Sequence, residues 1–145
     1  MALYTNLPVY KTSYDVLLDV HRYTNTFSRE HKYTIGEKLK EESIQVLIAI
    51  FKANKAKKNN RLVHIDTARE HVELLRLLSR IAKELEVLTA RLYVALNLKI
   101  EEVSKQLTAW QKYTAGAIIK FFINLIIGVL CNPNTTLTNC KDMFF

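Results

Sequence analysis

Glycine and proline are scarce in this sequence, and neither occurs between Gly36 and Gly116. Because tight turns between strands depend on these two residues, a sheet of short strands is disfavoured over that stretch. The same stretch is rich in leucine, alanine, glutamate, lysine and arginine, which are good helix formers. The sequence therefore predicts an all-α protein.

Cysteine is scarce as well, and the two cysteines, Cys131 and Cys140, both lie near the C-terminus. Two such residues do not make a disulfide framework. The N-terminus lacks the basic segment followed by an apolar segment that a secretory signal needs. We therefore expect a cytoplasmic protein, whose 145 residues can bury one stable core without cross-links.

Patterns typical of catalysis are also missing. The four histidines do not have a metal-binding spacing such as HExxH, and no glycine-rich phosphate loop is present. Two pairs of adjacent glutamates occur, at 41–42 and 101–102, but adjacent side chains on a helix do not face each other. We therefore expect no enzymatic activity, no metal and no cofactor. The predicted function is the binding of partners.

Hydrophobic periodicity predicts four helices of roughly 20 residues each, at about 12–32, 34–57, 66–86 and 89–110. Thr34 with Glu37 and Thr67 with Glu70 have the spacing of capping boxes, and Thr89 can cap the fourth helix. Matched lengths and short connections predict an antiparallel up-down-up-down four-helix bundle over residues 1–113.

The same periodicity predicts which side of each helix is buried. For the first helix that side carries Tyr14, Leu17, Leu18, His21 and Thr24. For the second it carries Leu39, Ser43, Val46, Ile50 and Ala53. For the third it carries Leu74, Leu78, Ile81 and Leu85. For the fourth it carries Leu92, Leu96, Ile100, Val103, Leu107 and Trp110.

An apolar C-terminal extension, residues 114–145, follows the bundle and is predicted to be helical as far as Cys131. Its weakly polar positions fall every four residues and so share one helical face: Gly116, Lys120, Asn124 and Gly128. The apolar run is at the short limit for crossing a bilayer, and Lys120 argues against a span. We expect a helix packed on the bundle or in a subunit interface.

Basic residues outnumber acidic residues, 21 against 14, for a net charge of +7. This excess favours an anionic partner such as nucleic acid, an acidic protein surface or a membrane. One group of cations lies at the second connection: Lys52, Lys55, Lys57, Lys58 and Arg61. A second group forms an outward stripe on the third helix, nearly opposite its predicted core side: Arg69, Arg76, Arg80 and Lys83. Such rows can track a phosphate backbone, so both groups are predicted to bind nucleic acid; the alternative is a solvated face without a ligand.

Three segments resemble one protein family: SREHKYTIGEKL at 28–39, IFKAN at 50–54 and LTAW at 107–110. The family is the group of four-helix bundles that includes proteins encoded in ribosomal RNA intervening sequences. It also includes the accessory variability determinant (Avd) proteins of diversity-generating retroelements. The similarity covers about residues 7–113, and the KYTIG segment favours the Avd branch. The apolar extension departs from the family, and is either genuine or the product of a shifted reading frame after Lys112.

The resemblance implies a protomer that assembles into a ring-shaped homopentamer with a positively charged surface. It further implies binding to RNA and to a reverse transcriptase, in support of mutagenic retrohoming, without an active site. It supplies no set of individual nucleic-acid ligands. The alternative function is a structural assembly protein that docks an acidic protein partner without binding nucleic acid. A membrane-associated role would depend on the extension alone.

Overall fold

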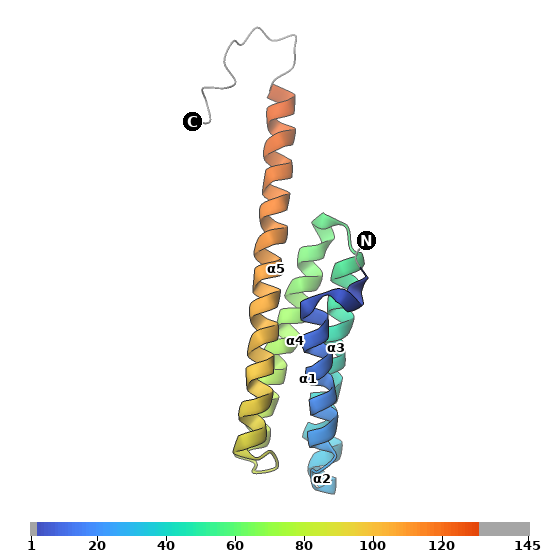
Figure 1. Ribbon diagram of the computed structural model, residues 1–145, viewed down its shortest axis with the longest axis vertical. Coiled ribbons are helices and arrows are strands. Elements are labelled where there is room, and N and C mark those ends of the chain that lie inside the picture. Colours follow the sequence, from blue (N-terminus) through green and yellow to red (C-terminus); the bar gives the residue numbers. More distant parts are fainter. Residues whose placement is uncertain (1–2, 131–145) are drawn as a thin grey trace.

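The structure is a computed structural model that describes residues 3–130 of the chain. Four long helices run antiparallel (Figure 1): α1 (Pro8–Thr24), α3 (Glu37–Lys55), α4 (Lys58–Glu84) and α5 (Ala90–Leu130). Two short pieces, α2 (Arg29–His31) and η2 (Lys32–Gly36), join α1 to α3, and η1 (Tyr4–Asn6) precedes α1. Both α1 and α4 pack against α3 and α5, which closes the four helices around one core. Residues 3–130 contain no strand, and the predicted all-α bundle is confirmed.

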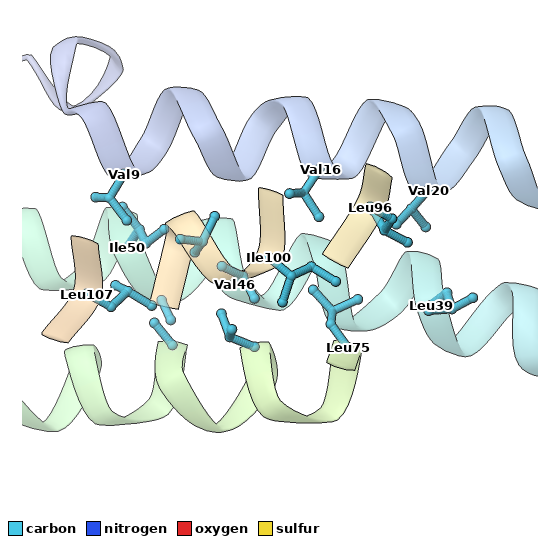
Figure 2. Close-up of a cluster of buried hydrophobic side chains, with 14 of the residues drawn as sticks. Val9, Val16, Val20, Leu39, Val46, Ile50, Leu75, Leu96, Ile100 and Leu107 are labelled. Carbon is cyan, nitrogen blue, oxygen red and sulfur yellow. The ribbon is translucent and has the colours of Figure 1, made fainter. Parts of the chain in front are cut away.

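The core is a ladder of aliphatic side chains contributed by all four long helices (Figure 2). Its largest fully buried members are Leu39, Ile50, Ile65, Leu75, Leu96, Ile100 and Leu107. The predicted core side of the second helix is confirmed, because all five of its residues are buried in α3. The prediction for the fourth helix is also confirmed, with Leu92 and Trp110 half-buried against the cluster.

The buried side of α4 differs from the predicted one. Its buried residues are Ile65, Ala68, Val72, Leu75, Ser79 and Ala82. Leu74, Ile81 and Leu85 of the predicted side are exposed, and Leu78 is half-buried. The physical reason is close packing, because alanine and serine at the inner positions let neighbouring helices approach one another. The larger leucines are left to flank that contact.

The first predicted helix is interrupted, because α1 ends at Thr24 and the chain turns before α2. The helix also begins earlier than predicted, at Pro8, whose fixed backbone angle suits a first helical position. Thr24 is buried as predicted, whereas Tyr14 is exposed and Val16 and Val20 take the core positions.

A wide helical turn at η2, in which backbone bonds reach one residue further than in an α-helix, brings Gly36 against the end of α1. A Cβ atom at Gly36 would lie 3.2 Å from the carbonyl oxygen of His31 and 3.5 Å from Cβ of Thr24. The sharp entry into α3 therefore depends on a residue without a side chain.

Two predicted capping boxes are wrong, because helical backbone already begins before each of them, at Arg29 for Thr34 and at Lys58 for Thr67. The Thr34 hydroxyl donates to the carbonyl oxygen of Glu30 at 2.9 Å, and the Thr67 hydroxyl donates to that of Val63 at 2.9 Å. Both threonines therefore lie inside helical segments. The predicted cap at Thr89 is confirmed, since its hydroxyl oxygen accepts the backbone N–H of Leu92 at 3.3 Å.

The helix α5 is 41 residues long and continues well past the other helices (Figure 1). Up to residue 128, Thr114 is the last buried residue of α5, and residues 119–126 are exposed. The extension therefore does not pack on its own bundle over 119–126. No helix within residues 3–130 is both long and apolar enough to cross a membrane. Cys131, Cys140 and the rest of the predicted extension lie outside the described residues.

Candidate nucleic-acid interface

The connection between α3 and α4 carries the first predicted group of cations. Lys52, Lys57 and Lys58 are exposed, and none of them forms an ion pair among residues 3–130. Lys55 lies over the ring of Phe51, with Nζ 4.6 Å from the ring centroid. Such a contact leaves the ammonium charged and accessible. These four lysines place an uncompensated positive charge at this end of the bundle.

Arg61 belongs to the same group in sequence but has a structural role. Its Nε donates to the carbonyl oxygen of Ala53 at 3.0 Å, and its Nη2 donates to that of Ala56 at 3.3 Å. These carbonyls belong to the last turn of α3 and the residue after it, where the helix leaves acceptors without backbone partners. Arg61 therefore caps α3 from the first turn of α4, and its guanidinium is occupied by this contact.

The second predicted group lies along α4, but it borders α5 and does not point away from the bundle. Arg69 reaches across to α5, where its Nη1 donates to Oε1 of Gln111 at 2.5 Å. The Gln111 amide in turn donates to Asp66 on α4 at 2.6 Å. The prediction of an outward stripe opposite the core was wrong because it depended on the wrong core side for α4.

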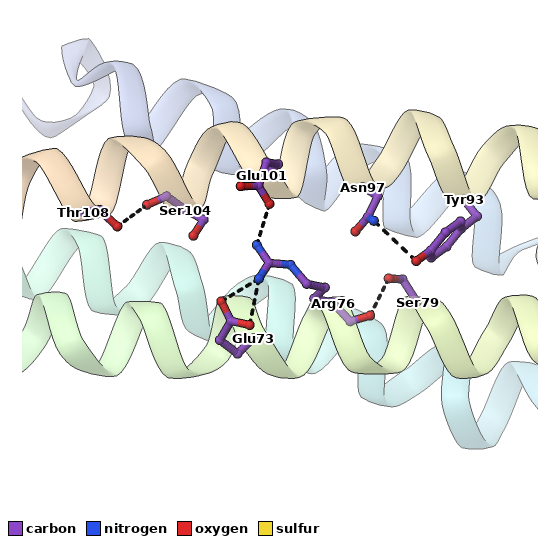
Figure 3. A network of polar contacts seen from close by, with 8 residues as sticks. All are labelled: Glu73, Arg76, Ser79, Tyr93, Asn97, Glu101, Ser104 and Thr108. Atoms are coloured by element: carbon purple, nitrogen blue, oxygen red, sulfur yellow. Dashed lines mark hydrogen bonds and ion pairs between the residues drawn. The ribbon is translucent and has the colours of Figure 1, made fainter.

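Arg76 is held at the centre of this border by two carboxylates (Figure 3). Its Nη1 donates to both oxygens of Glu73, at 2.9 and 2.8 Å, and its Nη2 donates to Glu101 of α5 at 2.8 Å. The charge of Arg76 is therefore compensated locally. Together the Arg76 guanidinium and its two carboxylate partners carry a net negative charge, so this cluster attracts a phosphate less strongly than an unpaired cation does.

Arg80 and Lys83 lie one and two turns further along α4. Arg80 is exposed and forms no ion pair within residues 3–130. It lines a shallow groove between α4 and α5 together with Arg76, Tyr93 and Asn97. Lys83 rests above the ring of Tyr93, with Nζ 5.2 Å from the centroid. Cations thus continue along this border toward the end of α4.

Two lysines of α5 adjoin the same border and were missed by sequence reasoning. Lys105 and Lys112 are exposed and line a hollow that also includes Glu101, the partner of Arg76. All residues that line this hollow belong to α5, and Glu101 connects it to Arg76 of α4. The sequence places Lys105 and Lys112 seven residues apart, on one side of a helix, but does not place that side near α4.

The structure thus divides the predicted site into two cationic surfaces. The connection surface consists of Lys52, Lys55, Lys57 and Lys58. The α4–α5 surface consists of Arg69, Arg76, Arg80, Lys83, Lys105 and Lys112. Lys58 and Lys83 lie at opposite ends of α4, about 38 Å apart at 1.5 Å per residue. A single compact ligand cannot contact both ends, whereas an extended polyanion can.

Within 3–130, no three histidine, cysteine or acidic side chains gather in a way that could hold a metal ion. A small gap between core side chains, about 10 Å³ in volume, is lined by Ser13, Ser43 and aliphatic residues. That volume is about the size that holds one water molecule, too small for a substrate.

Comparisons with known proteins agree with the bundle and with its end point. A search of curated proteins found no match to the chain. A sequence model of the bAvd-like family matches residues 9–114. The match begins in the first turn of α1 and ends at Thr114, which is buried in α5. Most of the chain is covered, and the apolar extension lies outside the match. The chain therefore belongs to the bAvd-like family, whose members are non-catalytic accessory proteins of diversity-generating retroelements.

Proposed function

We propose that this protein binds RNA and the reverse transcriptase of its retroelement in the cytoplasm, and thereby supports mutagenic retrohoming. The observation that carries the proposal is the group of exposed cations without carboxylate partners among residues 3–130, in particular Lys57, Lys58 and Arg80. Unpaired cations attract phosphates most strongly because no local carboxylate has to be displaced.

The RNA runs along α4, from the connection surface to the α4–α5 surface. Lysine and arginine on a convex helical face meet phosphates more readily than base edges. Binding is therefore tight at low salt and only weakly dependent on RNA sequence. In a homopentamer each protomer would repeat these surfaces, so that modest contacts would add up along one RNA.

Salt-dependent RNA binding by the full chain tests this proposal. Lys57→Gln with Lys58→Gln removes two unpaired cations, and we expect weaker binding and a flatter dependence of log K on log salt. The slope should change by about 0.7 for each phosphate of single-stranded RNA that the variant no longer neutralises. The matched control is Lys38→Gln with Lys40→Gln, which removes two lysines that are paired with Glu41 and Glu37 on α3.

The control should bind RNA nearly as the parent does, although its net charge changes by the same amount. Equal losses of affinity in the two double variants would mean that only total charge matters, and would contradict a defined surface. RNA binding that is absent from the parent itself would favour the alternative, in which the cationic surfaces dock an acidic protein. Copurification with the reverse transcriptase, with and without ribonuclease, then distinguishes a protein contact from an RNA bridge.

A further inference from the structure

The most unusual surface of the molecule is the free part of α5 beyond the bundle. Its large apolar side chains are 45–61% exposed: Ile119, Phe121, Phe122, Ile123, Leu125 and Ile126. At 100° per residue they spread over roughly 200° of the helix circumference and leave only the side that carries Lys120 and Asn124. An apolar face this wide requires burial on more than one side. No part of the bundle within residues 3–130 provides that burial.

The exposed apolar area is large enough to drive association. Six side chains exposing on the order of 100 Å² each give roughly 600 Å² per chain, as much as the largest apolar patches of ordinary monomers. If a small bundle of copies covers all six side chains, each pair of chains contributes about 1,200 Å², which reaches the lower limit of a stable specific interface. The free helix of a second copy can therefore provide the apolar surface that buries these side chains.

One side of the free helix differs from the rest. Lys120 and Asn124 lie one turn apart, in line with Gly116, and form the weakly polar stripe. Phe122 is two residues from each of them, which places it on the opposite side of the helix. Around Phe122, apolar residues recur at steps of three and four, as Ile118 or Ile119, Phe122, and Leu125 or Ile126. This is the spacing with which helices pack into one another's grooves.

We propose that residues 115–128 are a self-association helix that packs against the same segment of other copies of this chain through the Phe122 side. The polar stripe then faces solvent, which keeps the Lys120 ammonium hydrated and apart from the Lys120 of its partner. A flat surface of an unrelated partner would cover only one side of the free helix, whereas a small bundle of copies covers most of it. The segment lies outside the family match, so this contact is additional to any assembly through the four-helix bundle.

Disulfide cross-linking of the full-length chain tests the contact directly. In a background in which Cys131 and Cys140 are serine, one variant carries Phe122→Cys and its matched control carries Asn124→Cys. Residue 122 is at the midpoint of 115–128, so two copies bring it together whether the helices run parallel or antiparallel. We expect several-fold more disulfide-linked dimer from the Phe122→Cys variant than from the control. Assembly through the bundle alone would not produce this difference.

Amide hydrogen exchange provides a second readout without any new cysteine. We expect amides of residues 115–128 to exchange slowly in the parent and in Asn124→Glu, and much faster in Phe122→Glu. Equal cross-linking at the two positions, or protection that Phe122→Glu leaves unchanged, would overturn the proposal. Cross-linking and protection that appear only after phosphatidylglycerol vesicles are added would also overturn it, and would assign the free helix to a lipid surface.

Discussion

Leu75 and Leu77 show how sharply burial changes between residues only two positions apart. Leu75 is 2% exposed and lies among the side chains of all four helices, whereas Leu77 is 54% exposed on the outer face of α4. Two residues on a helix are separated by about 200°, so one side chain faces the core and the other faces away from it. Identical chemistry therefore contributes very differently to the free energy of unfolding.

Leu75→Ala should destabilise the protein by about 2–5 kcal/mol, because it removes buried methyl groups and leaves a cavity. Val63→Ala, the control on the same helix, should cost under about 1 kcal/mol, since the Val63 side chain is 64% exposed and lies outside the apolar patch around Leu77. Urea unfolding followed by circular dichroism measures both. Similar destabilisation by the two variants would mean that the core side of α4 is placed incorrectly.

Arg61 is a cation whose role is to stabilise the end of a helix. Arg61→Gln should lower the free energy of unfolding by about 1–2 kcal/mol, because carbonyl oxygens at the end of α3 lose a charged donor. Lys58→Gln nearby should change it by less than about 0.5 kcal/mol, as at other exposed sites. Thermal unfolding at one protein concentration compares the two variants. A free energy of unfolding that Arg61→Gln leaves unchanged would contradict the capping role.

At the scale of the helices, the sequence predicted which helices exist more accurately than which side of each helix is buried. The periodicity of α5 was unambiguous, because its leucine, isoleucine and valine residues within the bundle largely occupy a single side. In α4, by contrast, apolar residues point in nearly every direction between Leu74 and Leu78. Close packing against the neighbouring helices determines which side of α4 is buried, and the small side chains of Ala68 and Ala82 fit on that side. Hydrophobicity alone favours leucine over alanine and so selected the wrong side.

The candidate site was also predictable only in part, because its clusters within one segment are visible in the sequence and its contacts between helices are not. The lysines of the connection surface are a cluster in the sequence itself, so their proximity was recognisable. The α4–α5 surface depends on the neighbour of α4, and the sequence does not specify which residues of α5 lie beside Arg69. For the same reason, the carboxylates that hold Arg76 could not be foreseen. To predict a long-range partner such as Glu101, both the topology of the bundle and the register between α4 and α5 must be known.

Two glycines in helical backbone should respond oppositely to alanine. Gly116→Ala should stabilise the protein by about 0.5–1 kcal/mol, because alanine is the better helix former and its Cβ meets no atom within 4 Å. Gly36→Ala gains the same propensity but places a Cβ 3.2 Å from a backbone oxygen, which the tightly packed entry to α3 cannot easily move. We expect Gly36→Ala to be destabilising in thermal unfolding. Stabilisation by both substitutions would show that η2 adapts readily.

At the scale of the whole molecule, apolar surface remains on the outside of the bundle. Leu74, Leu77 and Ile81 are exposed together on the outer face of α4, on the far side from the core. Contiguous exposed apolar residues commonly mark an interface between proteins. We expect native mass spectrometry to give one closed oligomer, of five chains if the chain assembles as its family resemblance implies. Leu77→Glu should shift the distribution toward monomers, and an unchanged oligomer would exclude this face as an interface.

Truncation after Tyr113 tests whether the bundle is independent of the extension. Nearly all of the buried core precedes that residue, and Thr114 is the one buried side chain removed among the described residues. We expect the truncated chain to keep its helical circular dichroism and to unfold cooperatively. Disappearance of the helical signal would mean that the extension is needed for folding.

Because α5 is one continuous helix, the directions of side chains beyond the bundle follow from those of side chains within it. Phe122 comes eleven residues after Gln111, close to three full turns, so both lie on the side of α5 that faces α4. Copies that meet through Phe122 with their helices parallel would therefore turn their α4 cations toward a common axis, where like charges repel. A polyanion at that axis would relieve the repulsion. RNA would then favour association of the free helices, and by thermodynamic reciprocity their association would raise the affinity for RNA by the same factor.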